Sequence, residues 1–265
     1  MQLIEKHPKQ YDGALLACGM VGGTPMQLQF IGHVRALFDF YYPGVLPGDA
    51  NFIPEGFTPT LAQVSAIVQQ AVAGDPTGLF ALASTTQAAL DYIPGNVTVA
   101  GPSQSSLIQS LIVALYYQVI GTRDLIGRTH GHPAFDNSTT VYTLGTPVVP
   151  ALTALITARI AAANAGVDRF VSPPDAQNFL EKYYVPTGDL EIPVITVHNR
   201  WDYLVPYRHE AAFAQIVAEA GASDMLLQRT VMDFGHCANA PFRTAVVQSV
   251  LDLVGWATTG VKPAS

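Results

Sequence analysis

Three short apolar runs divide the 265-residue chain, and each is bounded by polar or turn-forming residues. They are residues 11–18 (YDGALLAC), 192–199 (IPVITVHN) and 225–232 (MLLQRTVM). Their length and their content of leucine and β-branched side chains are typical of buried strands. A segment with helical periodicity follows each run. This alternation of strands and helices predicts the α/β class, with a parallel sheet covered by helices.

Helical periodicity also fills most of the chain between the first two predicted strands. The apolar spacing predicts helices over residues 27–40, 61–91, 104–119, 151–165, 174–184, 207–220 and 241–258. Residues 1–4 match the last turn of a further helix, and cationic side chains follow it, as is favourable at a helix C-terminus. The stretch 41–60 is dense in proline and glycine, and 121–142 is polar, so both are predicted to be irregular.

About 170 residues separate the first two predicted strands, which is far more than a simple crossover needs. This block is predicted to be a large, mostly helical insertion that caps the sheet. The expected division is a core domain of residues 1–42 and 188–265 and a cap domain of residues 43–187.

Composition narrows the classes of function. With 49% hydrophobic and 12% charged residues, the chain is predicted to be globular with a large core. Its net charge of -7 argues against a nucleic-acid partner. Neither an unbroken apolar stretch of about 18–20 residues nor a secretory leader is evident, so no membrane partner is expected. The two cysteines exclude a disulfide-rich scaffold and leave the cellular compartment open.

The strongest chemical signal lies where the second and third predicted strands end. Asp202 follows the second strand in NRWDYLVP, and His236 follows the third in FGHCAN. The carboxyl ends of parallel strands meet at one edge of a sheet, where α/β folds place their sites. An acid followed by a histidine in this order is typical of a hydrolase triad. Taken singly, Asp202 is also explained as a turn cap, and His236 as a residue at a helix start.

Several of these stretches resemble a known family. PVITVHNRWDYLVP, FGHCANA and YDGALLACG resemble the C-terminal strands of the α/β-hydrolase superfamily, and YPGVLPG and FDNSTTVY resemble phrases in bacterial esterase-like members with a large helical cap. The resemblance implies an esterase-like serine hydrolase without a cofactor. Its substrate would be a small carboxylic ester or acyl compound, with Asp202 and His236 as catalytic residues.

The chain departs from that family pattern because it contains no Gly-x-Ser-x-Gly motif. The nearest imitation, GPSQSS at 101–106, lacks the second glycine. The nucleophile and the oxyanion-hole donors are therefore expected upstream of Met1. By this expectation the chain is a C-terminal portion that is inactive alone and self-associates through an exposed sheet edge. The alternatives are an inert truncated or binding fragment, and a non-hydrolytic α/β enzyme that uses His236 alone and would be revealed by activity that requires a cofactor.

Four further residues are candidates for substrate contacts. Trp201, Tyr203 and Phe135 are expected either to line a pocket or simply to pack, as aromatic residues do in both settings. Asp136, with its neighbour Asn137, is expected either to fix a loop of the cap or to contact substrate.

Weaker signals point to other chemistry. His130 and His132 near Asp136 suggest a metal, but no further ligand has matching spacing, so no metal is expected. GMVGG lacks the G-x-G-x-x-G spacing of a dinucleotide loop, and Asp39 is predicted in a helix. Cys18 and Cys237 form either a disulfide or two buried thiols, and Cys18 as a nucleophile lies on the wrong strand.

Overall fold

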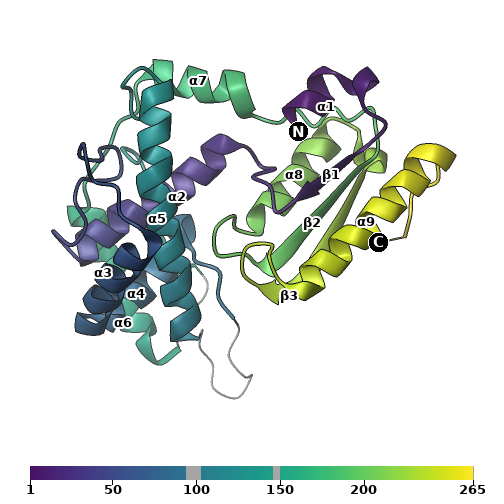
Figure 1. Cartoon of the computed structure of the whole chain (residues 1–265). Helices are drawn as coiled ribbons and strands as arrows, with labels where there is room; N and C mark the ends of the chain where they lie inside the picture. The colour runs from purple at the N-terminus through teal and green to yellow at the C-terminus, as the bar shows by residue number, and fades with distance from the viewer. Residues whose placement is uncertain (94–102, 146–149, 265) are drawn as a thin grey trace. The chain divides into compact units, whose positions relative to one another are not determined.

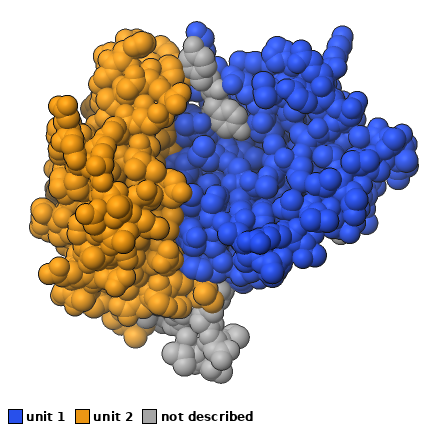
Figure 2. Space-filling view, viewed as in Figure 1, with its two compact units in different colours: residues 1–27, 180–265 blue, residues 28–179 orange. Residues whose placement is uncertain are grey.

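The computed structural model describes residues 1–93, 103–145 and 150–264. The chain divides into two compact units, which Figure 2 shows in different colours. Unit 1 comprises residues 1–27 and 180–265, and unit 2 comprises residues 28–179. The expected division at 42/43 and 187/188 differs from these bounds. The difference at the first boundary arises because residues 28–41 are helical and contribute their apolar side chains to the core of unit 2.

Unit 1 contains a parallel three-stranded sheet, as far as the described residues show. Its strands are β1 (Ala14–Ala17), β2 (Val194–Trp201) and β3 (Leu226–Phe234), with β2 in the middle (Figure 1). Each lies within a few residues of a predicted strand. The prediction of an α/β class with a parallel sheet is thus confirmed, and within the described part of the chain β1 is paired on one side only.

Two long helices follow β2 and β3. Helix α8 (Arg208–Glu219) follows β2, and α9 (Ala240–Thr259) follows β3. Because successive side chains of a strand point to opposite faces, β2 divides its residues between the two helices. Val194 packs in a cluster with Phe213 and Val217 of α8. Ile195 and Val197 pack instead with residues of α9. The same alternation directs Thr196 and His198 towards α8.

The first residues of the chain belong to unit 1. Helix α1 (Gln2–Lys6) is a single short helix in which Ile4 is buried in the same cluster as Val194. The carboxylate of Glu5 accepts hydrogen bonds from the backbone N–H groups of Thr187 and Gly188. Short 3-10 turns at Pro8–Gln10 and Ser223–Met225 precede β1 and β3.

Unit 2 is built mainly from helices. These are α2 (Thr24–Tyr41), α3 (Leu61–Gly74), α4 (Pro76–Ala83), α5 (Gln104–Arg128), α6 (Thr153–Gly166) and α7 (Pro174–Tyr184), with 3-10 turns at Thr86–Ala88 and Pro150–Leu152. The first residues of α2 and the last of α7 belong to unit 1. One apolar cluster with members from α2 to α6 forms the core of unit 2.

Two helix predictions in this unit were wrong in their bounds. The predicted helix 61–91 is two helices, because Asp75 and Pro76 start a new one: the Asp75 carboxylate accepts from the N–H groups of Thr77 and Gly78. Helix α5 runs on to Arg128, through residues predicted to be irregular, and Arg123 binds the carbonyl oxygens of Pro54 and Phe57 there. These tertiary contacts override the polar local pattern.

Helix α5 is also long and apolar enough to cross a membrane, judged by length and composition only. However, 61% of its most apolar window is buried inside the protein, as in the core helix of a globular domain. Its apolar side chains, such as Leu107 and Leu111, are members of the core cluster of unit 2. The helix is therefore weak evidence for a membrane span.

Candidate active site in unit 1

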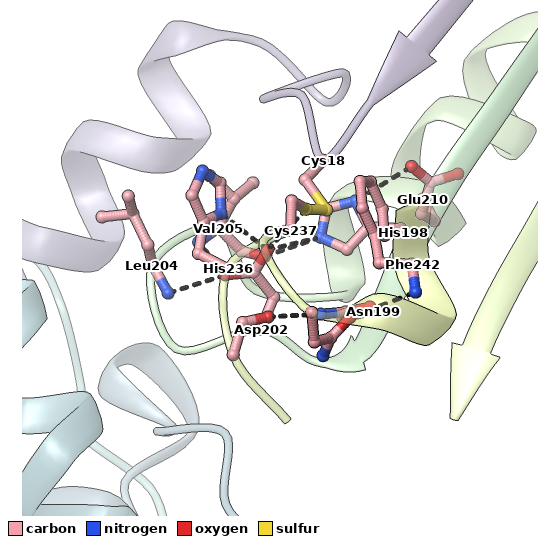
Figure 3. Close-up of a disulfide and its surroundings, with 12 residues drawn as sticks. Cys18, His198, Asn199, Asp202, Leu204, Val205, Glu210, His236, Cys237 and Phe242 are labelled. Atoms are coloured by element: carbon pink, nitrogen blue, oxygen red, sulfur yellow. Dashed lines mark hydrogen bonds and ion pairs between the residues drawn. A yellow bond between two sulfur atoms is a disulfide. The ribbon is translucent and has the colours of Figure 1, made fainter. Parts of the chain in front are cut away.

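Asp202 lies directly after β2, in the turn that leads to α8. Its side chain is fully buried, and its Oδ1 atom accepts hydrogen bonds from the N–H groups of Leu204, at 2.8 Å, and Val205, at 3.0 Å. These are the bonds of an aspartate that caps a turn. They leave the second carboxylate oxygen, Oδ2, to point towards the loop after β3 (Figure 3).

His236 lies in that loop, and its Nδ1 atom is 2.8 Å from Oδ2 of Asp202. Because both oxygens of an ionised carboxylate can only accept, this geometry assigns the Nδ1 proton to His236 and leaves its Nε2 lone pair free to take a proton. The His236 side chain is 32% exposed, whereas that of Asp202 is fully buried. The structure thus brings the two predicted catalytic residues together as a buried acid and a partly exposed base.

The Asp202 carboxylate is held in its charged form. Burial by itself raises the pKa of this carboxyl, but hydrogen bonds from His198 and His236 outweigh burial and lower the pKa below its ordinary value of 3.8. Asp202 is therefore ionised at neutral pH, which is the state needed to orient a histidine and to stabilise its protonated form.

Three contacts fix the loop that carries His236. The Asn199 amide donates to the carbonyl oxygen of Gly235 at 2.7 Å, and the Gly235 N–H donates to the carbonyl of Trp201 at 3.0 Å. Gly235 has a φ of 119°, a conformation that other residues rarely adopt. The third contact is a disulfide between Cys18, just after β1, and Cys237. The chain therefore enters and leaves His236 through restrained residues.

The disulfide resolves the alternatives left open for the cysteines. Cys18 and Cys237 are paired, with 6.1 Å between their Cα atoms, so neither is a free thiol or a nucleophile. Their sulfur atoms lie close to Asp202 and His236. In the described residues, the ligand-type atoms of these four side chains all lie within 4.8 Å of one another, as the ligands of a metal ion would. Two sulfurs bonded to each other cannot serve as thiolate ligands. This group therefore gives no support to a metal site.

His198 is a residue of the site that the sequence pattern did not single out. It lies on β2, is fully buried, and has its Nε2 atom 3.4 Å from Oδ2 of Asp202 and its Nδ1 atom 3.2 Å from Oε1 of Glu210 on α8. Burial by itself lowers the pKa of His198, but hydrogen bonds and charges of Asp202 and Glu210 outweigh it and raise the pKa to about 10. The available signal was a histidine inside an otherwise apolar strand, because a buried polar ring requires partners.

A second buried histidine, His209 on α8, has neutral partners. Its Nδ1 atom accepts from the N–H of Gly22 at 3.2 Å, and its Nε2 atom lies 3.1 Å from Oε1 of Gln27. Gln27 in turn donates to the carbonyl of Leu204 at 2.8 Å. Burial, followed by the charges of Arg208 and His198, lowers the pKa of His209 to about 3. This neutral ring ties the loop after β1 to the turn that holds Asp202.

The four predicted substrate contacts fall into both units. Trp201 and Tyr203 flank Asp202 in unit 1 and are half-buried, and the Tyr203 ring packs against Phe234. In unit 2, Phe135 is buried in the core. Asp136 accepts hydrogen bonds from Ser138 and Ser172 and fixes a loop. Phe135 and Asp136 thus have structural roles, and contact of any of the four with substrate stays a prediction.

The residues that suggested a metal site, a dinucleotide loop or a serine nucleophile form no such site in the described residues. His130 and His132 belong to no ligand cluster among the described residues. Asp39 lies in α2 and forms a salt bridge with Arg35, so it has no free carboxylate for a ribose. Of the GPSQSS stretch, residues 101 and 102 lie outside the described residues, and Ser105 and Ser106 lie in the first turn of α5.

Comparisons with known proteins give little further information. No family model matches the chain, and no curated protein matches it. Among solved structures, feruloyl esterase B from Aspergillus oryzae is similar over 99% of this chain, with a TM-score of 0.37 and 15% sequence identity. The chain spans 57% of the length of that protein. At this level the likeness is distant, and the geometry of unit 1 has to support any function by itself.

Proposed function

We propose that unit 1 carries the acid and the base of a serine-hydrolase-type active site in an α/β-hydrolase fold. The observation that supports this function is the 2.8 Å contact between Asp202 Oδ2 and His236 Nδ1. The two residues follow adjacent parallel strands, β2 and β3, at the edge where such sites are found. The acid is buried and ionised, and the base is partly exposed.

In this mechanism His236 first acts as a general base. Its Nε2 atom removes the proton of a serine hydroxyl while the serine oxygen attacks the carbonyl carbon of an ester or a related acyl compound. His236 then returns the proton to the leaving alcohol as a general acid, which leaves the serine acylated. In the second half of the cycle His236 removes a proton from water, which attacks the acyl carbon, and returns that proton to the serine oxygen as the acid product leaves. Asp202 keeps the proton on Nδ1 and stabilises the imidazolium that forms between the two steps.

The serine and its oxyanion-hole donors are proposed to come from residues outside the 265-residue sequence, because the sequence contains no Gly-x-Ser-x-Gly. Unit 2 is proposed to be the large helical insertion of such a fold. A small-molecule ester remains the proposed substrate, and no cofactor takes part in the proposed steps.

The test compares two proteins in an assay with p-nitrophenyl esters. One is the 265-residue chain, and the other also includes the residues encoded upstream of Met1. We expect turnover from the longer protein only. In the longer protein His236→Ala should abolish turnover, and Asp202→Asn should lower kcat by roughly 10⁴-fold because it favours the wrong tautomer of the histidine. His132→Ala, at an exposed position in unit 2, is the control.

Three results would contradict the proposal. Full activity of the His236→Ala variant in the longer protein would remove His236 from the mechanism. Turnover by the 265-residue chain that depends on His236 would show that the nucleophile lies within the sequence. If neither protein turns over esters while both remain folded, the inert binding fragment is the better interpretation.

A further inference from the structure

Both ring nitrogens of His198 face acceptor oxygens (Figure 3). Nδ1 lies 3.2 Å from Oε1 of Glu210, and Nε2 lies 2.9 Å from the carbonyl oxygen of Val205. Nε2 is also 3.4 Å from Oδ2 of Asp202. A neutral imidazole carries one N–H and can satisfy only one of these two sides, whereas an imidazolium satisfies both. The arrangement therefore favours the doubly protonated ring.

The Glu210 carboxyl group lies opposite that ring and is held by two further donors. It is only 3% exposed, and its Oε2 atom accepts from the Thr196 hydroxyl at 2.5 Å and from the Gln228 amide at 2.7 Å. Donors that bind a carboxylate stabilise its charged form. The other oxygen, Oε1, is left to His198. A buried carboxylate with this set of donors supplies the counter-charge that a buried imidazolium needs.

We propose that His198, held as an imidazolium by Glu210, is a positioning residue that keeps the Asp202 carboxylate ionised and directed at His236. The inference rests on the proposed function, because it assigns His198 and Glu210 to the support of the proposed acid. Neither residue contacts the reacting atoms.

His198 acts on Asp202 by two routes. The first is direct, through the charge of Nε2–H at 3.4 Å from Oδ2. The second runs through the turn: Nε2–H donates to the carbonyl of Val205, and the N–H of Val205 donates to Oδ1 of Asp202 at 3.0 Å. The ring thus stabilises the charge of the carboxylate and also fixes the backbone that orients it.

The surrounding groups support this protonation state. Burial alone lowers the pKa of His198, yet its two carboxylate neighbours raise it to about 10. Other ionisable groups near the Asp202–His198 pair include Tyr207, whose ring packs edge-on at 6.0 Å, His209 on α8, and His236 after β3. Two cations lie behind them: Arg200 over the Tyr207 ring, and Arg208, whose charge acts on His209. Gln228, which reaches the network from β3, is neutral, and the Cys237 sulfur near Asp202 is in the disulfide.

The direct test measures the ionisation of Asp202 by ¹³C NMR of the aspartate carboxyl carbons in the 265-residue chain, with Asp202→Asn to assign its signal. In the wild-type chain we expect the titration midpoint below the ordinary 3.8. In His198→Gln it should rise by about one to two pH units, because the charged donor is lost while burial persists. His132→Gln, at an exposed position in unit 2, is the control and should leave the midpoint in place. An unchanged midpoint in folded His198→Gln would overturn the proposal.

A second measurement avoids acid conditions. In chain labelled with ¹⁵N-histidine, both nitrogens of His198 should be protonated at neutral pH and should remain so until the pH nears about 10. In Glu210→Gln the loss of the second proton should move down towards the ordinary 6.5. A singly protonated His198 in the wild-type chain at neutral pH would overturn the proposal.

Both measurements are independent of catalysis. If the longer protein proves inactive towards esters while both NMR results hold, the proposed function fails and the proton arrangement stands. If the esterase activity holds and the Asp202 midpoint does not move, the role of His198 fails alone.

Discussion

Two histidines of unit 1 are both fully buried and yet carry opposite protonation states. The surroundings of His198 contain two carboxylates, from Asp202 and Glu210, and its pKa is raised to about 10. The surroundings of His209 contain the neutral amide of Gln27 and a backbone N–H, and its pKa is lowered to about 3. Burial alone lowers both values, so the difference comes from the charge of the partners.

The difference also separates two kinds of support for the proposed site. His198 places a positive charge next to the Asp202 carboxylate. His209 acts only on the backbone position of the turn, through Gln27 and the carbonyl of Leu204. A charge that loses its counter-ion inside a protein costs far more than a neutral group that loses a hydrogen bond. Substitutions around the two rings should therefore have unequal effects.

The largest difference is expected between Glu210→Ala and Gln27→Ala. The first removes one counter-charge of a buried imidazolium and should lower the free energy of unfolding by about 3–5 kcal/mol. The second leaves a neutral N–H of His209 without its acceptor and should cost about 1–3 kcal/mol. Urea unfolding of both variants at neutral pH measures the two costs. A greater loss for Gln27→Ala would break the comparison, because the charge at His198 would then have no energetic weight.

Removal of the disulfide should have the next largest effect. The bond between Cys18 and Cys237 closes a long loop, so the double variant Cys18→Ser/Cys237→Ser should lose about 2–4 kcal/mol. Neither histidine ring bonds to the sulfurs, so the pKa values of His198 and His209 should stay at about 10 and about 3 in this variant. If either histidine had its ordinary pKa in the double variant, the disulfide, and not the hydrogen-bond partners of each ring, would set the two protonation states.

The pH dependence of stability should show the two histidines as opposite limbs. The folded-state pKa of His198 lies above its ordinary 6.5, so its stabilisation is complete below 6.5 and is lost as the pH rises towards about 10. His209 has a folded-state pKa of about 3, so its neutral form stabilises above 6.5, and stability is lost as the pH falls through that interval. Each limb should follow the direction of its own pKa shift and should appear as a change of the urea midpoint within its own pH interval.

Variants assign the limbs. In urea midpoints measured across the pH range, His209→Gln should flatten the acid limb. His198→Gln should flatten the alkaline limb and reduce the acid limb only in part, because the charge of His198 is a lesser cause of the low His209 pKa. The pH profile of each variant is compared with that of the wild-type chain because Asp39 also titrates in mildly acid solution. Burial raises the pKa of Asp39 to about 6, so its protonation increases the stability of the fold as the pH falls, whereas protonation of His209 lowers it. Complete flattening of both limbs by either variant would contradict the separation of the two sites.

The sheet was predictable from the sequence because its strands are short apolar runs that need no distant partner to be recognised. The proximity of Asp202 and His236 followed from the same reasoning, since both come after parallel strands. Helix bounds in unit 2 were less predictable. The break at Asp75 depends on a cap, and the continuation of α5 to Arg128 depends on tertiary contacts.

The partners of the site residues could not be predicted. His198 and Glu210 lie on a strand and the following helix, and their contact depends on which face of β2 the helix α8 covers. The choice between a disulfide and two thiols was equally open, because it required the distance between the end of β1 and the loop after β3. Polar networks depend on three-dimensional register, which an apolar pattern does not encode.

The smallest expected effect lies at Gly22, whose N–H donates to Nδ1 of His209. A Cβ atom at Gly22 would meet Met26 Sδ at 2.7 Å and His209 Nδ1 at 3.0 Å. The methionine end can move, but the ring is held by Gln27, so Gly22→Ala should lengthen the hydrogen bond and cost about 1–2 kcal/mol. Gly19→Ala is the matched control in the same loop, because its Cβ would meet only Val21 Cγ1 at an ordinary 3.4 Å. Urea unfolding should show a loss for the first variant and a smaller one for the second, with the alkaline limb unchanged in both. Equal losses would mean that the His209 ring moves aside and does not restrict the side chain at position 22.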